Sequence, residues 1–333
     1  GHLYYLNQGN KTDANGYVKT TCKVAKDLLA YVDLQYRAVD YSTEGLDADR
    51  RQIAVQDNLG FFNPKGGLFY KMSNNEQLYG SYAVGNREPT RTDYIDAPNG
   101  NTPLHETLSD IELGYKHFAH RHHAQVNLYN MQYKNQLVLT GEVNDVGSPI
   151  RQNVASSFRR GVELEWVWKV YRGIKWQGNI NLSQNKIDQF DETVYDYTNG
   201  FDVVVNEFTD TDISFSPNAT AASIVSLNLI ESGKNVMEFS WMAKYVGKQF
   251  LDNTSNDDRS IDAYLVNDAR LIFTHRGHGF KEVRLNMTVN NVLNEMYSSN
   301  GYTYSYIAGD SITENFYFPQ AGINFLVGLD LIF

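Results

Sequence analysis

The chain has 333 residues, with 39 acidic and 29 basic side chains and a net charge of −10, and its Lys and Arg residues form no run. This composition argues against nucleic acid as a partner. The sequence holds no run of about eighteen apolar residues, so it predicts no membrane-spanning helix. A membrane β-barrel stays compatible, because its signal is spread over strands of about ten alternating residues. The single cysteine, Cys22, cannot form an internal disulfide.

Apolar side chains recur at every second position in many segments, which gives each predicted strand one apolar and one polar face. The clearest apolar sets are Val32, Leu34 and Tyr36; Val162, Leu164, Trp166 and Trp168; Trp176, Ile180 and Leu182; Leu285, Met287 and Val289; and Ile323, Phe325, Val327, Leu329, Leu331 and Phe333. Charged side chains keep to the other face. Lipid would enforce this segregation, because a Lys or Arg facing lipid at mid-depth costs roughly 2–4 kcal/mol.

Between 124 and 139 the alternation is ambiguous. Val126 and Leu128 share one phase, whereas Tyr129, Met131 and Tyr133 share the other. Two explanations fit: a β-bulge within the strand, or a strand that rises above the lipid with aromatic side chains on its inner face.

The connections between the predicted strands alternate strictly between short and long. The short ones lie near 25–27, 73–75, 119–122, 171–173, 232–234 and 275–280; the long ones lie near 43–59, 86–106, 141–155, 187–215, 251–262 and 297–317. This pattern predicts an all-β, antiparallel transmembrane barrel segment of about thirteen strands, with short periplasmic turns and long extracellular loops. Residues 1–333 are expected to form one part of a single barrel domain.

Several segments resemble the carboxy-terminal part of TonB-dependent outer-membrane receptors, particularly the Bacteroidetes-type receptors that are similar to siderophore transporters. The matching segments are 86–94, 106–116, 135–141, 160–165, 290–297 and the final strand, 318–333. Each is weak alone, but they occur in the family's order and cover nearly the whole chain.

The resemblance implies a 22-stranded barrel in the bacterial outer membrane, closed around an amino-terminal plug that meets the TonB complex. The implied function is energy-coupled import of a ferric siderophore or a similar chelate such as haem or cobalamin, without catalysis and without a resident cofactor or metal. The plug and the first strands have no counterpart in this sequence, which begins as if inside a longer protein. A second chain that supplies them, their loss by proteolysis and their simple omission stay open.

Ligand binding is expected in the long loops. Arg87 and Arg91, near Tyr94, could bind an anionic chelate through charge-assisted hydrogen bonds, or could serve packing. Three tyrosines in the last long loop offer rigid aromatic contact area, or could form a girdle at the membrane interface. They are Tyr302, Tyr304 and Tyr306.

Five further charged side chains are expected to face the lumen or the plug: Arg37, Lys116, Arg159, Glu163 and Glu165. The His-rich turn at 117–123 is interpreted as polar structure rather than a metal site, and the acidic loop at 252–259 as a solvated loop. The sequence shows no nucleophile-elbow, phosphate-loop or Cys-x-x-Cys motif, so no catalytic residue is predicted. A soluble all-β glycan-binding module and a passive porin are the alternative functions.

Overall fold

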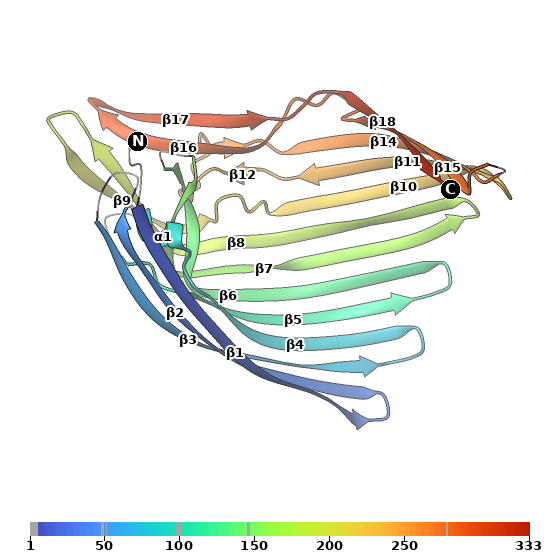
Figure 1. Cartoon of the computed structure of the whole chain (residues 1–333), viewed down its shortest axis with the longest axis horizontal. Coiled ribbons are helices and arrows are strands. Elements are labelled where there is room, and N and C mark those ends of the chain that lie inside the picture. The colour runs from blue at the N-terminus through green and yellow to red at the C-terminus, as the bar shows by residue number, and fades with distance from the viewer. Residues whose placement is uncertain (1–5, 48–49, 51, 98–101, 145–146, 278) are drawn as a thin grey trace.

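A computed structural model describes residues 6–47, 50, 52–97, 102–144, 147–277 and 279–333. It is almost entirely β-structure, and its one short helix lies at the end of the molecule that carries the long loops (Figure 1). The elements are β1 (Leu6–Ala25), β2 (Leu28–Leu46), β3 (Gln52–Lys71), β4 (Glu76–Arg87), α1 (Arg91–Ile95), β5 (Glu106–Phe118), β6 (His122–Val143), β7 (Pro149–Tyr171), β8 (Ile174–Asp196), β9 (Asp202–Asp212), β10 (Ala219–Ser232), β11 (Asn235–Val246), β12 (Gln249–Phe250), β13 (Ser260–Ile261), β14 (Tyr264–His275), β15 (Glu282–Asn290), β16 (Ser298–Ala308), β17 (Asp310–Pro319) and β18 (Asn324–Ile332).

The main sheet runs in the order β1-β2-β3-β4-β5-β6-β7-β8-β10-β11-β14-β15-β18, which makes thirteen antiparallel strands in the described part of the chain. This confirms the predicted all-β meander of about thirteen strands. The sheet curves into an open trough, with β1 and β18 at its two edges (Figure 1). Each strand pairs with the next along this path because the connection between them is a hairpin or a local excursion.

One face of the trough carries a continuous apolar surface, as the register shows. In one row, Leu113 lies opposite Leu128, Leu128 opposite Val162, and Val162 opposite Leu182. Leu113, Leu128 and Leu182 are 54%, 49% and 51% exposed, and within the described residues no second sheet covers them. A soluble sandwich would bury such a row, whereas a membrane barrel presents it to lipid.

The opposite, concave face is polar and hydrogen-bonded across strands. Tyr79 Oη donates to Asn127 Oδ1 at 2.9 Å, and Tyr129 Oη donates to Asn181 Oδ1 at 3.2 Å. Tyr129 therefore lies on the inner face. Because the β6–β7 register is unshifted from His122 to Leu139, the ambiguous segment has no bulge there. Of the two explanations from the sequence, an aromatic inner face is correct.

The short connections lie where they are predicted, but two long ones are shorter than expected. The strands β2 and β3 extend into the predicted loop at 43–59, and β6 and β7 extend into the one at 141–155. The 23 residues of β8 are about twice the 9–11 that cross a bilayer. These strands project well beyond the apolar rows, because continued pairing keeps their backbone groups hydrogen-bonded.

The remaining elements build the long-loop end. There, β9 pairs with β8, and β16 with β17 forms a hairpin. Helix α1 is capped by Thr90, whose side chain and Asp93 form a reciprocal capping box. A small buried core lies at this end, formed by Val138, Val154, Ile187, Phe190 and Ile213. No helix of the described residues is long and apolar enough to cross a membrane.

Candidate ligand-binding region at the long-loop end

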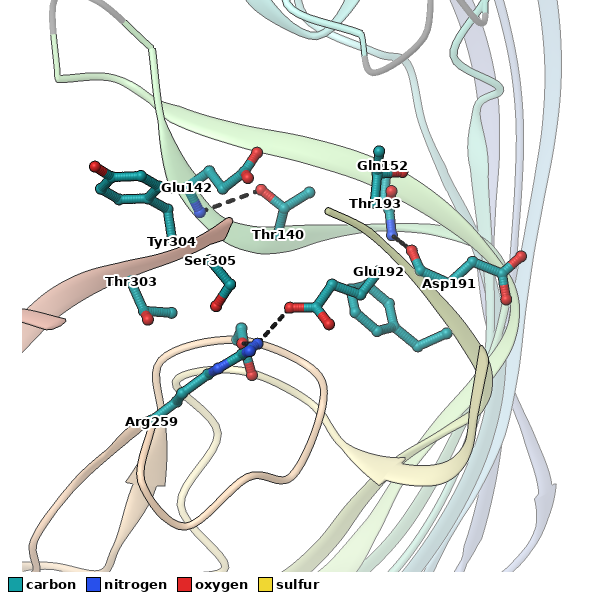
Figure 2. A pocket seen from close by; sticks show the side chains of 12 residues that line it. Thr140, Glu142, Gln152, Asp191, Glu192, Thr193, Arg259, Thr303, Tyr304 and Ser305 are labelled. Atoms are coloured by element: carbon teal, nitrogen blue, oxygen red, sulfur yellow. Dashed lines mark hydrogen bonds and ion pairs between the residues drawn. The ribbon is translucent and has the colours of Figure 1, made fainter. Parts of the chain in front are cut away.

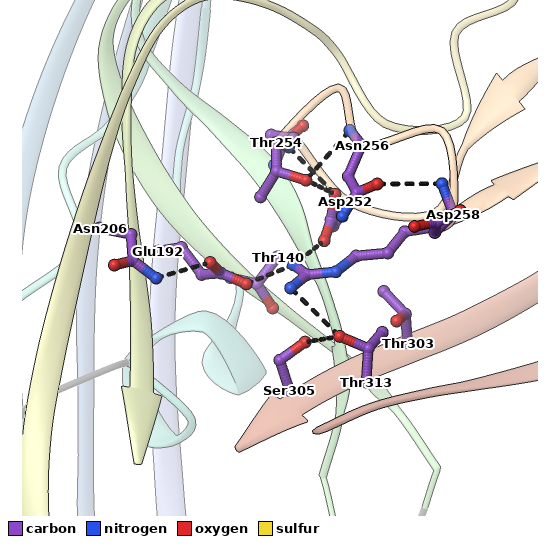
Figure 3. Close-up of polar contacts among 12 residues, drawn as sticks. Thr140, Glu192, Asn206, Asp252, Thr254, Asn256, Asp258, Thr303, Ser305 and Thr313 are labelled. Carbon is purple, nitrogen blue, oxygen red and sulfur yellow. Dashed lines mark hydrogen bonds and ion pairs between the residues drawn. The ribbon is translucent and has the colours of Figure 1, made fainter. Parts of the chain in front are cut away.

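Three loop segments meet at Arg259, which is 8% exposed. Its Nη1 donates to Asp252 Oδ2 at 2.8 Å and to Glu192 on β8, while Nη2 donates to Thr313 Oγ1 on β17 at 3.4 Å (Figure 3). Burial opposes the charge on Arg259, but Asp252 and Glu192 hold the pKa of the guanidinium above its ordinary value. The side chain thereby ties the β11–β14 loop to the β8–β9 and β16–β17 hairpins.

The acidic loop that contains Arg259 is buried at its start, so its interpretation as a solvated loop is wrong for residues 252–254. Asp252 Oδ1 accepts from the backbone N of Thr254 at 3.0 Å. Asn253, fully buried, donates to the Leu139 carbonyl at 2.6 Å and accepts from the Ser214 backbone at 2.8 Å. Asp252 Oδ1 and Asn253 Oδ1 therefore each accept a hydrogen bond from the protein itself, which gives these oxygens a structural role.

A cavity of about 40 Å³ lies beside Arg259, between β6, β8 and β16 (Figure 2). Glu142 and Glu192 line it together with Thr140, Ser305 and Arg259. Burial, and then the charge of Glu192, raise the pKa of Glu142. The cavity has room for water and is far smaller than ligand pockets of about 300–1,000 Å³.

Two larger hollows at the same end have the size of ligand pockets. One, of about 540 Å³, is lined by Leu104, Arg151, Asp191 and Val205 among others. The other, of about 760 Å³, lies where the β6–β7 connection faces β16 and includes Phe215, Tyr302 and Phe318. The Tyr302 and Phe318 rings have centroids 6.0 Å apart and form an aromatic wall of this hollow, and Tyr302 also stacks on Phe316 at 4.7 Å.

An aromatic tip cluster forms where two hairpins meet. We define it as Tyr195, Tyr197, Phe201, Tyr304 and Tyr306. Strand β16 pairs in parallel with β8, with Tyr306 opposite Tyr195. Ring centroids are 5.6 Å apart for Tyr304 and Tyr306, 6.4 Å for Tyr197 and Tyr306, and 5.4 Å for Tyr195 and Phe201. Tyr197 and Phe201 are 52% and 67% exposed, so the cluster presents open ring surface.

Sequence reasoning found Tyr304 and Tyr306 but missed their partners on the β8–β9 hairpin. The Tyr195-x-Tyr197 alternation repeats the pattern of the last long loop and was the available signal. Tyr302 lies further along β16 in the aromatic wall, where it contacts Phe316 and Phe318.

Arg87, Arg91 and Tyr94 lie apart from this cluster, beside the first strands. Arg87 Nε is 3.0 Å from Glu106 Oε1, and Arg91 Nη2 donates to Asn7 Oδ1 at 2.6 Å. Tyr94 donates to Asp57 and stacks on Tyr41. Burial, followed by the hydrogen bond to Asp57, raises the pKa of Tyr94. All three side chains thus hold the β4–β5 connection in place through contacts within the protein. Ligand binding by them stays a prediction.

The five charged residues expected to face inward lie on the face opposite the apolar rows. Arg37 Nη2 is 2.5 Å from Asp13 and 2.8 Å from Glu88. Lys116 lies over the Tyr79 ring at 5.2 Å, and Arg159 Nη1 donates to Ser216 at 2.8 Å. Glu163 accepts from Asn127 at 3.3 Å, and Glu165 lies opposite Gln125. Contacts between these residues and a plug stay a prediction.

The His-rich turn brings two imidazoles together: His117 Nε2 and His122 Nε2 are 3.1 Å apart. His123 instead packs edge-on against Phe118. Within the ranges that the structure describes, no three His, Cys, Asp or Glu side chains gather in a way that could hold a metal ion.

Residues 3–292 match the family described as TonB dependent receptor-like, beta-barrel. The chain belongs to this family. The predicted TonB-dependent receptor resemblance is thereby confirmed, whereas its Bacteroidetes-type detail stays a prediction. The family consists of receptors and transporters of the bacterial outer membrane rather than enzymes.

Solved structures of uptake receptors and of a metal transporter share the fold. The ferric yersiniabactin uptake receptor FyuA from Yersinia pestis has a TM-score of 0.69 and 16% identity, with 98% of this chain covered and 46% of that one. The siderophore receptor PiuA from Acinetobacter baumannii has a TM-score of 0.71 and 14% identity over 97% and 43% of the two chains. The copper transporter OprC has a TM-score of 0.66 and 14% identity over 97% and 48%.

This receptor chain therefore spans less than half the length of the solved structures that it matches. At these identities the likeness shows the fold alone. No curated protein matches the chain.

Proposed function

We propose that this chain supplies barrel wall and outer loops to an outer-membrane importer that takes up a ferric siderophore or similar metal chelate, driven by TonB through a plug outside this sequence. Haem and cobalamin are the next candidates for cargo. Family membership supports the class of protein. The observation that carries the proposal is the aromatic tip cluster. Its rings are held by the β8–β9 and β16–β17 hairpins, which Arg259 ties together.

The geometry favours contact through ring area and tyrosine hydroxyls. A tyrosine ring offers rigid surface at low entropic cost, together with one polar handle. The β8–β9 and β16–β17 hairpins hold their rings in place through the parallel pairing at Tyr306 and through the Arg259 contacts below it. Such preorganisation reduces the ordering cost that a bulky chelate would otherwise pay on binding.

Arg87 and Arg91 form the alternative contact for an anionic chelate. A ligand would have to displace Glu106 from Arg87 and Asn7 from Arg91. Exchange of one charge-assisted partner for another leaves little net gain, because the first bond is lost. We therefore place the cargo's main contacts at the tip cluster and in the aromatic-walled hollow beside Tyr302.

The test is binding of radiolabelled ferric chelates to whole cells that carry the full-length receptor with and without TonB. The variant Tyr197→Ala with Tyr306→Ala should weaken binding about tenfold or more, as expected for loss of central aromatic anchors. Tyr82→Ala, a half-exposed tyrosine on the apolar face, is the matched control and should bind as the parent does. Uptake of the chelate at the same rate without TonB, or equal binding by the double variant, would contradict the proposal.

A further inference from the structure

A hollow of about 650 Å³ at the short-turn end carries a concentration of positive charge. We call it the basic pocket and define it by Arg121, Lys169, Arg172, Lys175 and Arg270. Among its described lining residues, Glu238 is the only acidic side chain. This balance is the reverse of the whole chain, in which acidic residues outnumber basic ones by 39 to 29.

Two of these cations are placed where they repel each other. Lys169 on β7 lies directly opposite Lys175 on β8, and the Lys169 backbone N bonds to the Arg121 carbonyl at 2.7 Å, which brings a third cationic residue close. Like charges directly opposite each other on neighbouring strands destabilise a sheet. Such a cost is expected where a ligand of opposite charge offsets it.

Two other cations at the same end, both on the β14–β15 side, are paired with a carboxylate. Arg276 and Arg284 share Glu282, with N–O distances of 3.0 and 2.6 Å. In contrast, no ion pair neutralises Arg121, Lys169, Arg172 or Lys175 within the described part of the chain. The buried Nε of Arg270 also has no hydrogen-bond partner among the described residues. An unsatisfied buried donor is costly, which again points to an acceptor supplied from outside.

The register places the pocket on the concave face. Lys175 lies opposite Ser226, and Ser226 bonds to Ser240 on β11, so these residues form one inner row. The apolar face carries Trp168 opposite Trp176 at this height. An anionic lipid headgroup would approach from the Trp168 side, away from the pocket.

We propose that the basic pocket is the docking site of an acidic peptide segment that presents at least two carboxylates to Lys169, Lys175 and the flanking arginines. Its volume exceeds the need of a single small anion, and its spread from β7 to β14 suits an extended peptide. The inference is independent of the proposed cargo, because the pocket lies at the opposite end of the sheet from the aromatic tip cluster.

The test uses the full-length receptor in detergent micelles and a fluorescent hexapeptide of alternating Asp and Glu, with binding followed by anisotropy at low salt. The matching Asn–Gln peptide should bind about tenfold more weakly or worse, because charge carries the contact. The variant Lys169→Gln with Lys175→Gln should weaken binding of the acidic peptide by a similar factor. Its thermal midpoint without peptide should be equal or higher, because a repulsion is removed.

Lys234→Gln is the matched control, since it removes one charge from another short turn outside the pocket and should leave binding intact. Equal weakening by Lys234→Gln would show unspecific attraction and overturn the proposal. So would displacement of the peptide by equimolar inorganic phosphate, or by vesicles of anionic phospholipid as effectively as by unlabelled peptide. A lowered thermal midpoint in the double variant would assign the two lysines a structural role instead.

Discussion

Arg259 and Glu192 form a buried ion pair that joins a loop to a strand 67 residues earlier in the chain. Asp252 shares the same guanidinium nitrogen, so two carboxylates meet one cation in a largely buried site (Figure 3). The group is stable only as a whole, because each carboxylate would be left uncompensated without Arg259.

Substitution Arg259→Met should therefore destabilise the long-loop end by about 3–5 kcal/mol, the cost of breaking a buried pair. Hydrogen exchange in β9 and β17 should accelerate accordingly, while the strands near the short turns keep their protection. Lys248→Met is the control, because its partner Asp257 has 81% of its side chain exposed, and an exposed pair contributes about 1 kcal/mol or less. Equal exchange rates in the two variants would contradict a bracing role for Arg259.

Glu142 should make this end of the molecule sensitive to pH. Burial and the charge of Glu192 raise its pKa above the ordinary value of 4.5. The folded state therefore binds this proton more tightly than the unfolded state does, and the resulting stability is present below pH 4.5 and is lost as pH rises through the raised pKa.

The variant Glu142→Gln should remove that dependence. Relative to the parent protein, its loop end should gain stability as pH rises above 4.5, the ordinary pKa of a glutamate, as measured by hydrogen exchange at the C-terminal end of β6 over a pH series. Asp257→Asn, a change of an exposed carboxylate, is the control. A parent and variant with parallel pH profiles would show that Glu142 titrates normally.

The two faces of β8 should respond oppositely to the same substitution. Leu182→Lys places a charge in the apolar row. It should lower the free energy of unfolding in lipid vesicles by up to about 4 kcal/mol, the value for a charge that faces lipid at mid-depth of a bilayer. Asn179→Lys, on the inner face opposite Glu165, should be nearly neutral. The fraction folded, measured by heat-modifiable gel mobility over a urea series, distinguishes them; equal losses would mean that lipid does not contact the row.

The strands of the barrel wall were predictable because they depend on residues that are close together in the sequence. Alternation at Leu164 and Glu163, together with short turns such as 171–173, fixes faces and hairpin partners between neighbouring strands. Strand ends were less predictable, since polar segments such as 43–46 continue the pairing without an apolar pattern.

The long-loop contacts could not be read in the same way. Tyr306 pairs with Tyr195, and Asn253 bonds to Leu139, in each case across more than a hundred residues. Neither contact produces a periodic pattern of apolar residues in the sequence. The acidic loop looked solvated because its composition is polar, but its side chains bond to each other and to the backbone of β6.

Gly141 offers a direct test of how tightly β6 packs on the loop at 251–252. Gly141 and Gly147 both have positive φ, at 98° and 79°, so alanine strains the backbone at either position by about 1–2 kcal/mol. A Cβ at Gly141 would also lie 2.8 Å from Asp252 Cβ and 3.0 Å from the Leu251 carbonyl oxygen, whereas a Cβ at Gly147 meets open space. Gly141→Ala should therefore lower the protection of the 251–254 backbone well beyond the effect of Gly147→Ala, as followed by hydrogen exchange. If the two variants lose the same protection, the loop can move aside at little cost and Arg259 does not hold it in place.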